Sequence, residues 1–401
     1  MKKHYWRLPE GVDEVLPPDA LHLEKLRRTL IDLFVSWGYS FVIPPMVEYL
    51  DALMVGAGQD LELQTIKFVD QATGRMLGMR PDITSQTARI DAHSLKTVEA
   101  QRLCYAGTVL HANPRGVSAN RNPIIVGAEI FGSANLTADA EIVSLMARAL
   151  KSIGIDELVV ELGHIGIYRA LVDALKIDAE LEAELFKAVQ MKSSADIELL
   201  LAGVEGKVSI KDCLLELPDM MGGAEVFETE SLSKASLPAL DVALQRLQTL
   251  AALVLRGSSS KNEQVNLRFD LGELTGYGYH TGVVFTAYTA THGQAVAKGG
   301  RYDGIGKAFG ETRSATGFDL DLKALPKKLP TNTSEKVWVA FNPAISGKRL
   351  ETLMNKVDLL RFSGRVVVFG LEESELPVSG CEAELVFEEE HWNIKPLEKD
   401  S

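Results

Sequence analysis

Two glycine-rich stretches of this 401-residue chain have spacings close to those of phosphate-binding loops. GYGYHTG, from Gly276 to Gly282, misses the dinucleotide-binding pattern by one residue and lacks a strand–helix–strand context. In GIGKA, from Gly304 to Ala308, the first glycine is misplaced and Ala308 has no hydroxyl for magnesium. We interpret both stretches as turn and hairpin glycines.

Metal ligation is not indicated by residue spacing either. The eight histidines include no HExxH pair. Cys104, Cys213 and Cys381 lie far apart in the chain and form no CxxC pair. This pattern argues against a zinc site or a disulfide framework and fits the reducing cytoplasm. We expect no metal and no cofactor.

Five dispersed segments stand out together, although each alone carries little information. They are RPDIT (80–84), RLCYAGTVLHANPRG (102–116), GAEIFG (127–132), RFDLGELTGYGYHTGVVF (268–285) and GGRYDGIGKAFG (299–310). In this order they resemble the catalytic domain of histidyl-tRNA synthetase, a class II synthetase, over about residues 7–325. The resemblance implies an α+β fold, with an antiparallel sheet flanked by helices.

The resemblance also implies a histidine-binding pocket, because acidic and hydroxyl side chains accept hydrogen bonds from ammonium and imidazole N–H groups. Asp82 replaces the family's glutamate, His280 replaces a tyrosine, and Ile125 stands where synthetases carry a glutamine. The pocket either still senses histidine or is kept only for packing. The residues carried over as its candidates are Asp82, Thr84, Tyr105, Glu129, Tyr277, Tyr279 and His280.

The same alignment of motifs implies that the synthetase chemistry is lost. His111 stands in place of the ATP-binding arginine, Thr275 in place of the histidine-specific catalytic arginine, and Ala324 in place of the arginine that meets the triphosphate. Each lost contact in a preorganised site typically costs roughly a hundred- to a thousand-fold in rate. We therefore expect a chain that is not an enzyme by itself.

One family matches this pattern of retained and lost residues. The opening LPEGVDEVLPP (8–18), LGHIGIYRALV (162–172) and LPDMMGG (217–223) resemble the regulatory subunit of ATP phosphoribosyltransferase. That resemblance implies a non-catalytic, allosteric subunit of histidine biosynthesis, in a hetero-oligomer with a short catalytic subunit. It further implies that the chain makes the catalytic subunit active and confers feedback inhibition by histidine. The alternatives are a working histidyl-tRNA synthetase and another class II amino-acid ligase.

The periodicity of the sequence predicts the elements that position these segments. Apolar residues at helical spacing predict a helix after Pro18 that ends at Gly38, and 39–43 reads as a strand. Residues 64–79 suggest a hairpin, 102–110 and 124–132 a pair of strands, and a helix follows from Ala138. Further strands are predicted at 265–272, 283–289 and 293–300.

These elements suggest a synthetase-like domain at residues 1–325 with a helical insertion at about 165–257. Residues 326–335 form a linker, and 336–401 a small C-terminal α/β region. Gly38, Pro44, Pro45 and Glu48 occupy the place of the first class II motif, which implies a homodimer.

Composition restricts the partners. A formal charge of −13 and the lack of a dense lysine and arginine cluster weigh against nucleic acid. The longest apolar run, at 248–256, is too short to span a membrane, and no secretory signal is evident.

Arg115, Arg121 and Arg301 are interpreted as solvated loop arginines.

Overall fold

A computed structural model of the chain describes residues 6–55, 59–114, 120–257, 265–290, 292–304, 313–326, 335–373 and 375–397. The chain divides into two compact units, 1–329 and 330–401. Most of the predicted linker, and Arg115 and residues 305–310 of the last motif, lie outside the described residues. Within the described part of the chain, no helix is long and apolar enough to cross a membrane.

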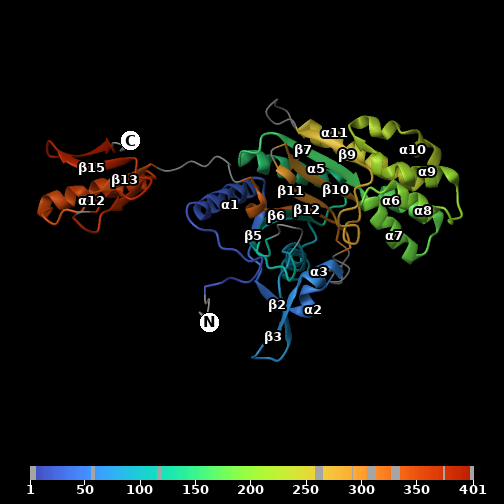
Figure 1. Ribbon diagram of the computed structural model, residues 1–401, viewed down its shortest axis with the longest axis horizontal. Coiled ribbons are helices and arrows are strands. Elements are labelled where there is room, and N and C mark those ends of the chain that lie inside the picture. The colour runs from blue at the N-terminus through green and yellow to red at the C-terminus, as the bar shows by residue number, and fades with distance from the viewer. Residues whose placement is uncertain are drawn as a thin grey trace. The chain divides into compact units, whose positions relative to one another are not determined.

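A nine-stranded mixed sheet forms the centre of the first unit (Figure 1). Neighbouring strands are antiparallel except for the parallel pairs β1–β5 and β7–β9. In spatial order the strands are β1 (Ser40–Val42), β5 (Gln101–Thr108), β6 (Ile124–Phe131), β12 (Ala315–Asp321), β11 (His292–Arg301), β10 (Val283–Thr289), β7 (Leu158–His164), β9 (Asn266–Asp270) and β8 (Met221–Gly222). The α+β class and all the predicted strands of this sheet are confirmed.

Three helices cover one face of the sheet: α1 (Asp19–Ser36), α5 (Leu136–Ser152) and α11 (Pro238–Gly257). The predicted helix after Pro18 is α1, which buries Leu26, Leu30 and Phe34 at helical spacing. Asn135 caps α5 by accepting a hydrogen bond from the backbone N–H of Thr137. On β6 and β12, apolar residues at alternate positions pack against these helices. The residues between them therefore point to the opposite face of the sheet.

Residues 165–257 are mainly helical and gather at the β7–β9–β8 end of the sheet (Figure 1). The last helix, α11, turns back over the sheet and packs on α5. The helices before it are α6 (Ile165–Leu175), α7 (Ala179–Gln190), α8 (Ser194–Leu201), α9 (Val208–Glu216) and α10 (Glu230–Ala235), with short 3-10 turns η2 (Leu217–Asp219) and η3 (Ala224–Glu228).

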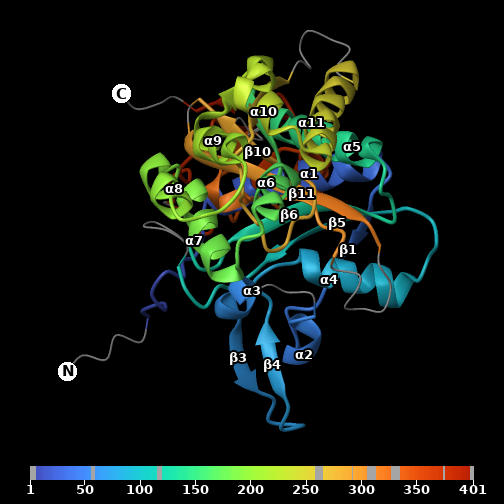
Figure 2. The same ribbon diagram turned by 90° about the vertical axis from the view of Figure 1, so that its right-hand side faces the viewer.

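A second, three-stranded sheet projects from the first unit (Figure 2). It comprises β2 (Val47–Tyr49), β4 (Met76–Met79) and β3 (Ile66–Val69), with the short helices α2 (Leu50–Leu53) and α3 (Gln59–Gln64) beside it. The predicted hairpin is confirmed, because Asp70 caps its turn and Gly74 takes a positive φ of 70°. A buried polar helix, α4 (Thr84–Arg89), continues into the π-helical turn η1 (Ile90–Leu95).

The second unit is a small α/β domain. One helix, α12 (Gly347–Phe362), buries Leu353, Val357 and Leu360 against a four-stranded sheet. In spatial order its strands are β14 (Val366–Phe369), β13 (Lys336–Val339), β15 (Ala383–Glu388) and β16 (His391–Pro396).

Candidate functional site

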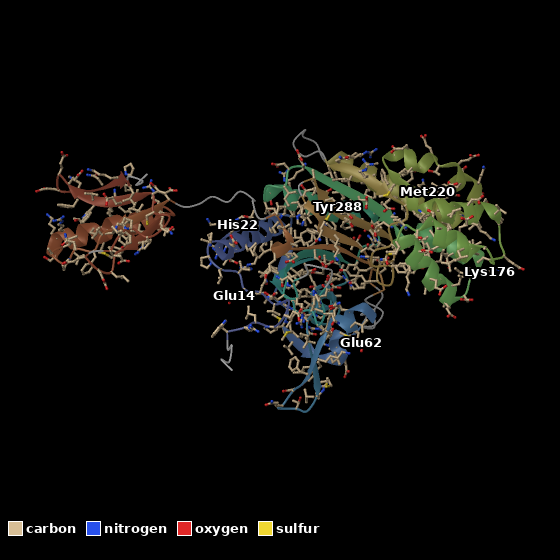
Figure 3. All side chains as sticks on the ribbon, in the orientation of Figure 1. Glu14, His22, Glu62, Lys176, Met220 and Tyr288 are labelled. Carbon is tan, nitrogen blue, oxygen red and sulfur yellow. The ribbon has the colours of Figure 1, made fainter. Side chains whose placement is uncertain are left out.

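A cleft of about 1430 Å³ opens on the face of the large sheet opposite α5. Strands β6, β10, β11 and β12 contribute to its floor, and α4 begins at one wall. Residues 13–17 form another wall, together with part of α1. Glu14 and His22, labelled beside α1 in Figure 3, line this part of the cleft.

Glu129 lies at the floor of the cleft on β6 and is 1% exposed. Its Oε1 accepts hydrogen bonds from the hydroxyls of Thr84 and Tyr105, both at 3.0 Å. Its Oε2 accepts one from the hydroxyl of Tyr302 at 2.5 Å. A carboxyl group at this depth requires such partners, since burying an unpaired polar group is costly.

The neighbouring strand leaves room for this carboxyl group only because of a glycine. Gly317 on β12 lies directly opposite Glu129, and a β-carbon added there would sit 1.4 Å from Oε2 of Glu129. Gly127, two residues along β6, similarly admits Tyr105, whose hydroxyl would lie 2.5 Å from an added β-carbon. The small residues of these motifs therefore shape the floor of the cleft.

Burial determines the protonation states at the floor. It raises the pKa of Glu129 to about 8, although the three hydroxyl donors act in the opposite direction. Burial raises the pKa of Tyr105 and Tyr302 well above the ordinary value, so both keep the proton that they donate. It also lowers the pKa of His280 to about 4, so that imidazole is neutral at pH 7.

Aromatic side chains form one side of the cleft. The ring of Tyr279 stacks on that of Tyr302, with centroids 5.0 Å apart and an angle of 22° between the planes. The Tyr279 hydroxyl and Nδ1 of His280 are buried without a hydrogen-bond partner among the described residues. Both residues line the cleft, so a bound ligand is one candidate partner for these atoms.

Asp82 lies two residues before the start of α4. One oxygen, Oδ1, accepts hydrogen bonds from the backbone N–H groups of Ile83 and Thr84, at 2.7 and 3.2 Å. The backbone thus holds one carboxylate oxygen while the side chain still lines the cleft. The hydroxyl of Thr84 donates a hydrogen bond to Glu129, and Asp82 lies two residues before Thr84. The structure therefore brings the two acidic candidates, Asp82 and Glu129, to one region.

Tyr277 is the candidate that the structure does not bring to this group. Its hydroxyl donates to Oε1 of Glu182 on α7 at 2.7 Å, and its ring packs on Tyr168 and Phe186. Arg169 covers the ring from the other side, 4.9 Å from its centroid. Tyr277 therefore joins the helical insertion to the motif and does not line the cleft.

Comparison with known proteins agrees with this architecture. Residues 11–325 match the family model described as histidyl-tRNA synthetase. Curated relatives called ATP phosphoribosyltransferase regulatory subunit, from Pseudomonas paraeruginosa and Pseudomonas syringae pv. tomato, are each 42% identical over 98% of both chains. The chain belongs to the ATP phosphoribosyltransferase regulatory subunit family.

Solved structures carry the same fold. The regulatory subunit/histidyl-tRNA synthetase from Bacillus halodurans has a TM-score of 0.81 and 26% identity, covering 94% of this chain and 96% of that one. Histidyl-tRNA synthetase from Nostoc sp. PCC 7120 has a TM-score of 0.76 at 17% identity, covering 95% and 91%. Members of this family are regulatory, non-catalytic subunits that function in histidine biosynthesis.

The three positions at which the motifs predict a lost arginine all line the cleft. His111 is buried, with Nε2 3.1 Å from the carbonyl oxygen of Pro81. Thr275 is exposed and donates its backbone N–H to Glu273, and Ala324 ends the 3-10 turn η6 (Leu322–Ala324). None of these three side chains offers a permanent positive charge to a phosphate.

Charge in the cleft now favours a ligand with N–H donors over a polyphosphate. No arginine lines it within the described part of the chain, and its lysines are Lys298 and Lys323, the second of which pairs with Asp13. The lining carboxyl groups outnumber them: Asp13, Glu14, Asp19, Asp82, Glu129, Glu273, Asp319 and Asp321.

One other carboxylate group could hold a cation. Oxygens of Glu161, Asp270 and Glu273 lie within 4.8 Å of one another. Nζ of Lys192 binds both oxygens of Asp270 at 2.7 Å, so a protein cation already sits there. We assign no metal to this group.

Three residues were not predicted correctly from the sequence. Tyr302 lies in GGRYDG but was not selected, since nothing in the motif indicates which side chain reaches Glu129. Arg301 is not a solvated loop arginine: it is 3% exposed and pairs with Asp139, which is fully buried, at 2.8 Å. Arg121 donates to the backbone carbonyls of His111 and Glu10, so it too has partners.

Proposed function

We propose that this chain binds a short-form ATP phosphoribosyltransferase catalytic subunit, makes it active, and renders it sensitive to histidine. The observation that carries the proposal is the cleft itself. It has acceptors for N–H groups around Glu129, while His111, Thr275 and Ala324 stand where a synthetase would carry its ATP-binding and catalytic arginines.

Histidine is the effector that fits this cleft. Its ring suits the buried end, where Glu129 accepts and the Tyr279–Tyr302 stack provides an aromatic wall. Its ammonium group suits Asp82 at the start of α4. Regulation then requires that histidine bind two arrangements of the complex with unequal affinity.

We also propose that the chain forms a homodimer through the β1 edge of the large sheet. β1 is the terminal strand, and Ile43, directly after it, is 81% exposed. β1 and β5 are parallel, with Ser40 opposite Leu103, so Trp37 and Val98 both lie near the end where these two strands begin. Val98 is 95% exposed. Exposed apolar residues beside an unpaired edge favour association with a second copy.

Reconstitution tests the main proposal. The chain is mixed with the short catalytic subunit from the same genome, and size-exclusion chromatography and transferase rate are measured with and without histidine. We expect a larger complex, a faster rate and new inhibition by histidine. No complex and no change in rate would refute the proposal.

Variants localise the effector site. Above pH 8, where Glu129 with its pKa of about 8 is mostly ionised, Glu129→Gln should raise the histidine concentration needed for half-inhibition by roughly tenfold or more, since it removes a charged acceptor. The matched control is Glu198→Gln, on the exposed face of α8, which should not change it. Equal inhibition of both variants would place histidine elsewhere in the complex.

Two measurements address the remaining claims. Light scattering should report a dimer that Ile43→Glu converts to a monomer, whereas Leu199→Glu, exposed on α8, leaves it intact. A monomeric unmodified chain would contradict the dimer. Histidine-dependent ATP–pyrophosphate exchange at ordinary synthetase rates would instead favour the ligase alternatives.

A further inference from the structure

Tyr302 occupies a distinctive position beside the floor of the cleft. It is 2% exposed, and its ring packs between Tyr279, at 5.0 Å, and Phe131, at 6.4 Å. Its hydroxyl reaches past these rings to Oε2 of Glu129. The ring is therefore held by packing, and the hydroxyl makes a single polar contact that can be removed separately.

The hydrogen bonds of Glu129 limit what its carboxyl group can offer a ligand. A carboxylate has roughly four acceptor positions on its two oxygens. Thr84 and Tyr105 both donate to Oε1, and Tyr302 alone donates to Oε2. With Tyr302 in place and Glu129 ionised, as it mostly is above its pKa of about 8, about one acceptor position is left, and it lies on Oε2.

The direction of that remaining position matters because the carboxyl group lies on the cleft floor. Gly317 lets Oε2 approach β12 closely, and Tyr302 holds the same oxygen from the side of β11. Without the hydroxyl, no described side chain would fix Oε2, and the carboxyl group would be held only through Oε1, by Thr84 and Tyr105.

We infer that Tyr302 is a positioning residue for effector recognition: its hydroxyl holds Glu129 so that the carboxyl group presents a single directed acceptor to a ring N–H of the bound amino acid. This inference rests on the proposed binding of histidine in the cleft. It adds that Tyr302 sets the preference for a ring that can donate a hydrogen bond over an isosteric ring that cannot.

Two observable consequences distinguish this role from simple packing. Discrimination between histidine and 3-(2-thienyl)alanine, whose ring has no N–H, should depend on the Tyr302 hydroxyl. The pH dependence of binding should depend on it as well, because the hydrogen bond from Tyr302 lowers the pKa of Glu129 and its loss raises that pKa.

The experiment compares Tyr302→Phe with a matched variant, Tyr39→Phe. Tyr39 is also 2% exposed and donates to a glutamate, Glu141, but lies outside the cleft lining. Calorimetry measures binding of histidine and 3-(2-thienyl)alanine to the whole chain, between about pH 6.5 and pH 9. Tm values of both variants report folding.

At pH 9, where Glu129 is mostly ionised, we expect Tyr302→Phe to weaken histidine binding by about tenfold, consistent with a hydrogen bond to a charged group. Binding of thienylalanine should change less, so discrimination falls, and the pH midpoint of histidine binding should move upward. Tyr39→Phe should alter none of these quantities. Histidine binding by Tyr302→Phe within twofold of the unmodified chain, with the same pH midpoint, would overturn the inference.

Failure of the two proposals can be told apart. If the unmodified chain binds no histidine, the effector site itself is wrong, and this inference falls with it. If the unmodified chain binds histidine and Tyr302→Phe loses both ligands equally, Tyr302 only packs the cleft, and the effector site stands.

Discussion

Gly317→Ala should be among the most damaging single-methyl additions in this chain. The new β-carbon would lie 1.4 Å from Oε2 and 2.3 Å from Cδ of Glu129, distances at which atoms cannot coexist. It would also lie 2.8 Å from the backbone carbonyl oxygen of Ala128. The strand cannot move away easily, because β12 is paired on both sides, with β6 and β11.

The cost follows from what Glu129 must give up. Moving its carboxyl group breaks the hydrogen bonds from Thr84, Tyr105 and Tyr302 and leaves buried polar groups without partners. Each such bond is worth about 0.5–1.5 kcal/mol to a neutral carboxyl group and about 1.5–3 kcal/mol to a charged one, but losses within one network do not add. We expect a decrease of about 3–5 kcal/mol in the free energy of unfolding, which is large for a single substitution.

Urea unfolding of the isolated chain measures this. Gly293→Ala is the matched control, since a β-carbon at that position on β11 meets nothing within 4 Å. In a Glu129→Ala background, Gly317→Ala should cost less than it does alone, because the main clash is gone and only the contact with the Ala128 carbonyl remains. Equal costs in both backgrounds, or a Gly317→Ala cost no larger than that of Gly293→Ala, would refute the reasoning.

Three further predictions follow from described contacts. Asp139→Asn should cost about 2–4 kcal/mol in urea unfolding, because it removes the buried counter-charge of Arg301 and leaves only the partly exposed Asp303 at 3.3 Å. Between about pH 7 and pH 8 the folded state binds more protons than the unfolded state, because burial raises the pKa of Glu129 to about 8 and that of Glu161 to about 7. Tm should therefore fall with rising pH, and Glu129→Gln should reduce that slope. Tyr277→Phe should cost about 1 kcal/mol through the lost bond to Glu182 while leaving histidine affinity unchanged, as titration calorimetry can check.

Regular elements were predictable because their periodicity is local. The helix after Pro18 and the hairpin at 64–79 each carry their own pattern of apolar residues and turn residues. The strands of the large sheet were also visible as short apolar runs. Their spatial order was not, since β12 lies between β6 and β11 through contacts that are distant in sequence.

The candidate site was only partly predictable, for a related reason. Tyr277 and Tyr279 are two residues apart, a spacing that puts side chains on one side of a strand. The segment is instead folded by turns, with the N–H of Tyr277 bonded to Leu274 and that of Tyr279 to Gly276, which has a φ of 72°. The two rings therefore diverge, one toward α7 and one into the cleft.

Arg301 shows the same limit. Its partner Asp139 is 162 residues away, so no local pattern could reveal the pair. An arginine in a glycine-rich motif looks like a loop residue until the strand that carries it is placed against α5.

Arg301 and Tyr302 are consecutive residues that point to opposite sides of the sheet, one to α5 and the other to Glu129. Shifting a strand by one residue exchanges its two faces. A single-codon insertion or deletion within 292–300 that shifted the end of β11 would therefore turn an arginine toward the cleft and a tyrosine toward Asp139. A change in the length of this strand would thus place a cation in a cleft whose described lining contains no arginine.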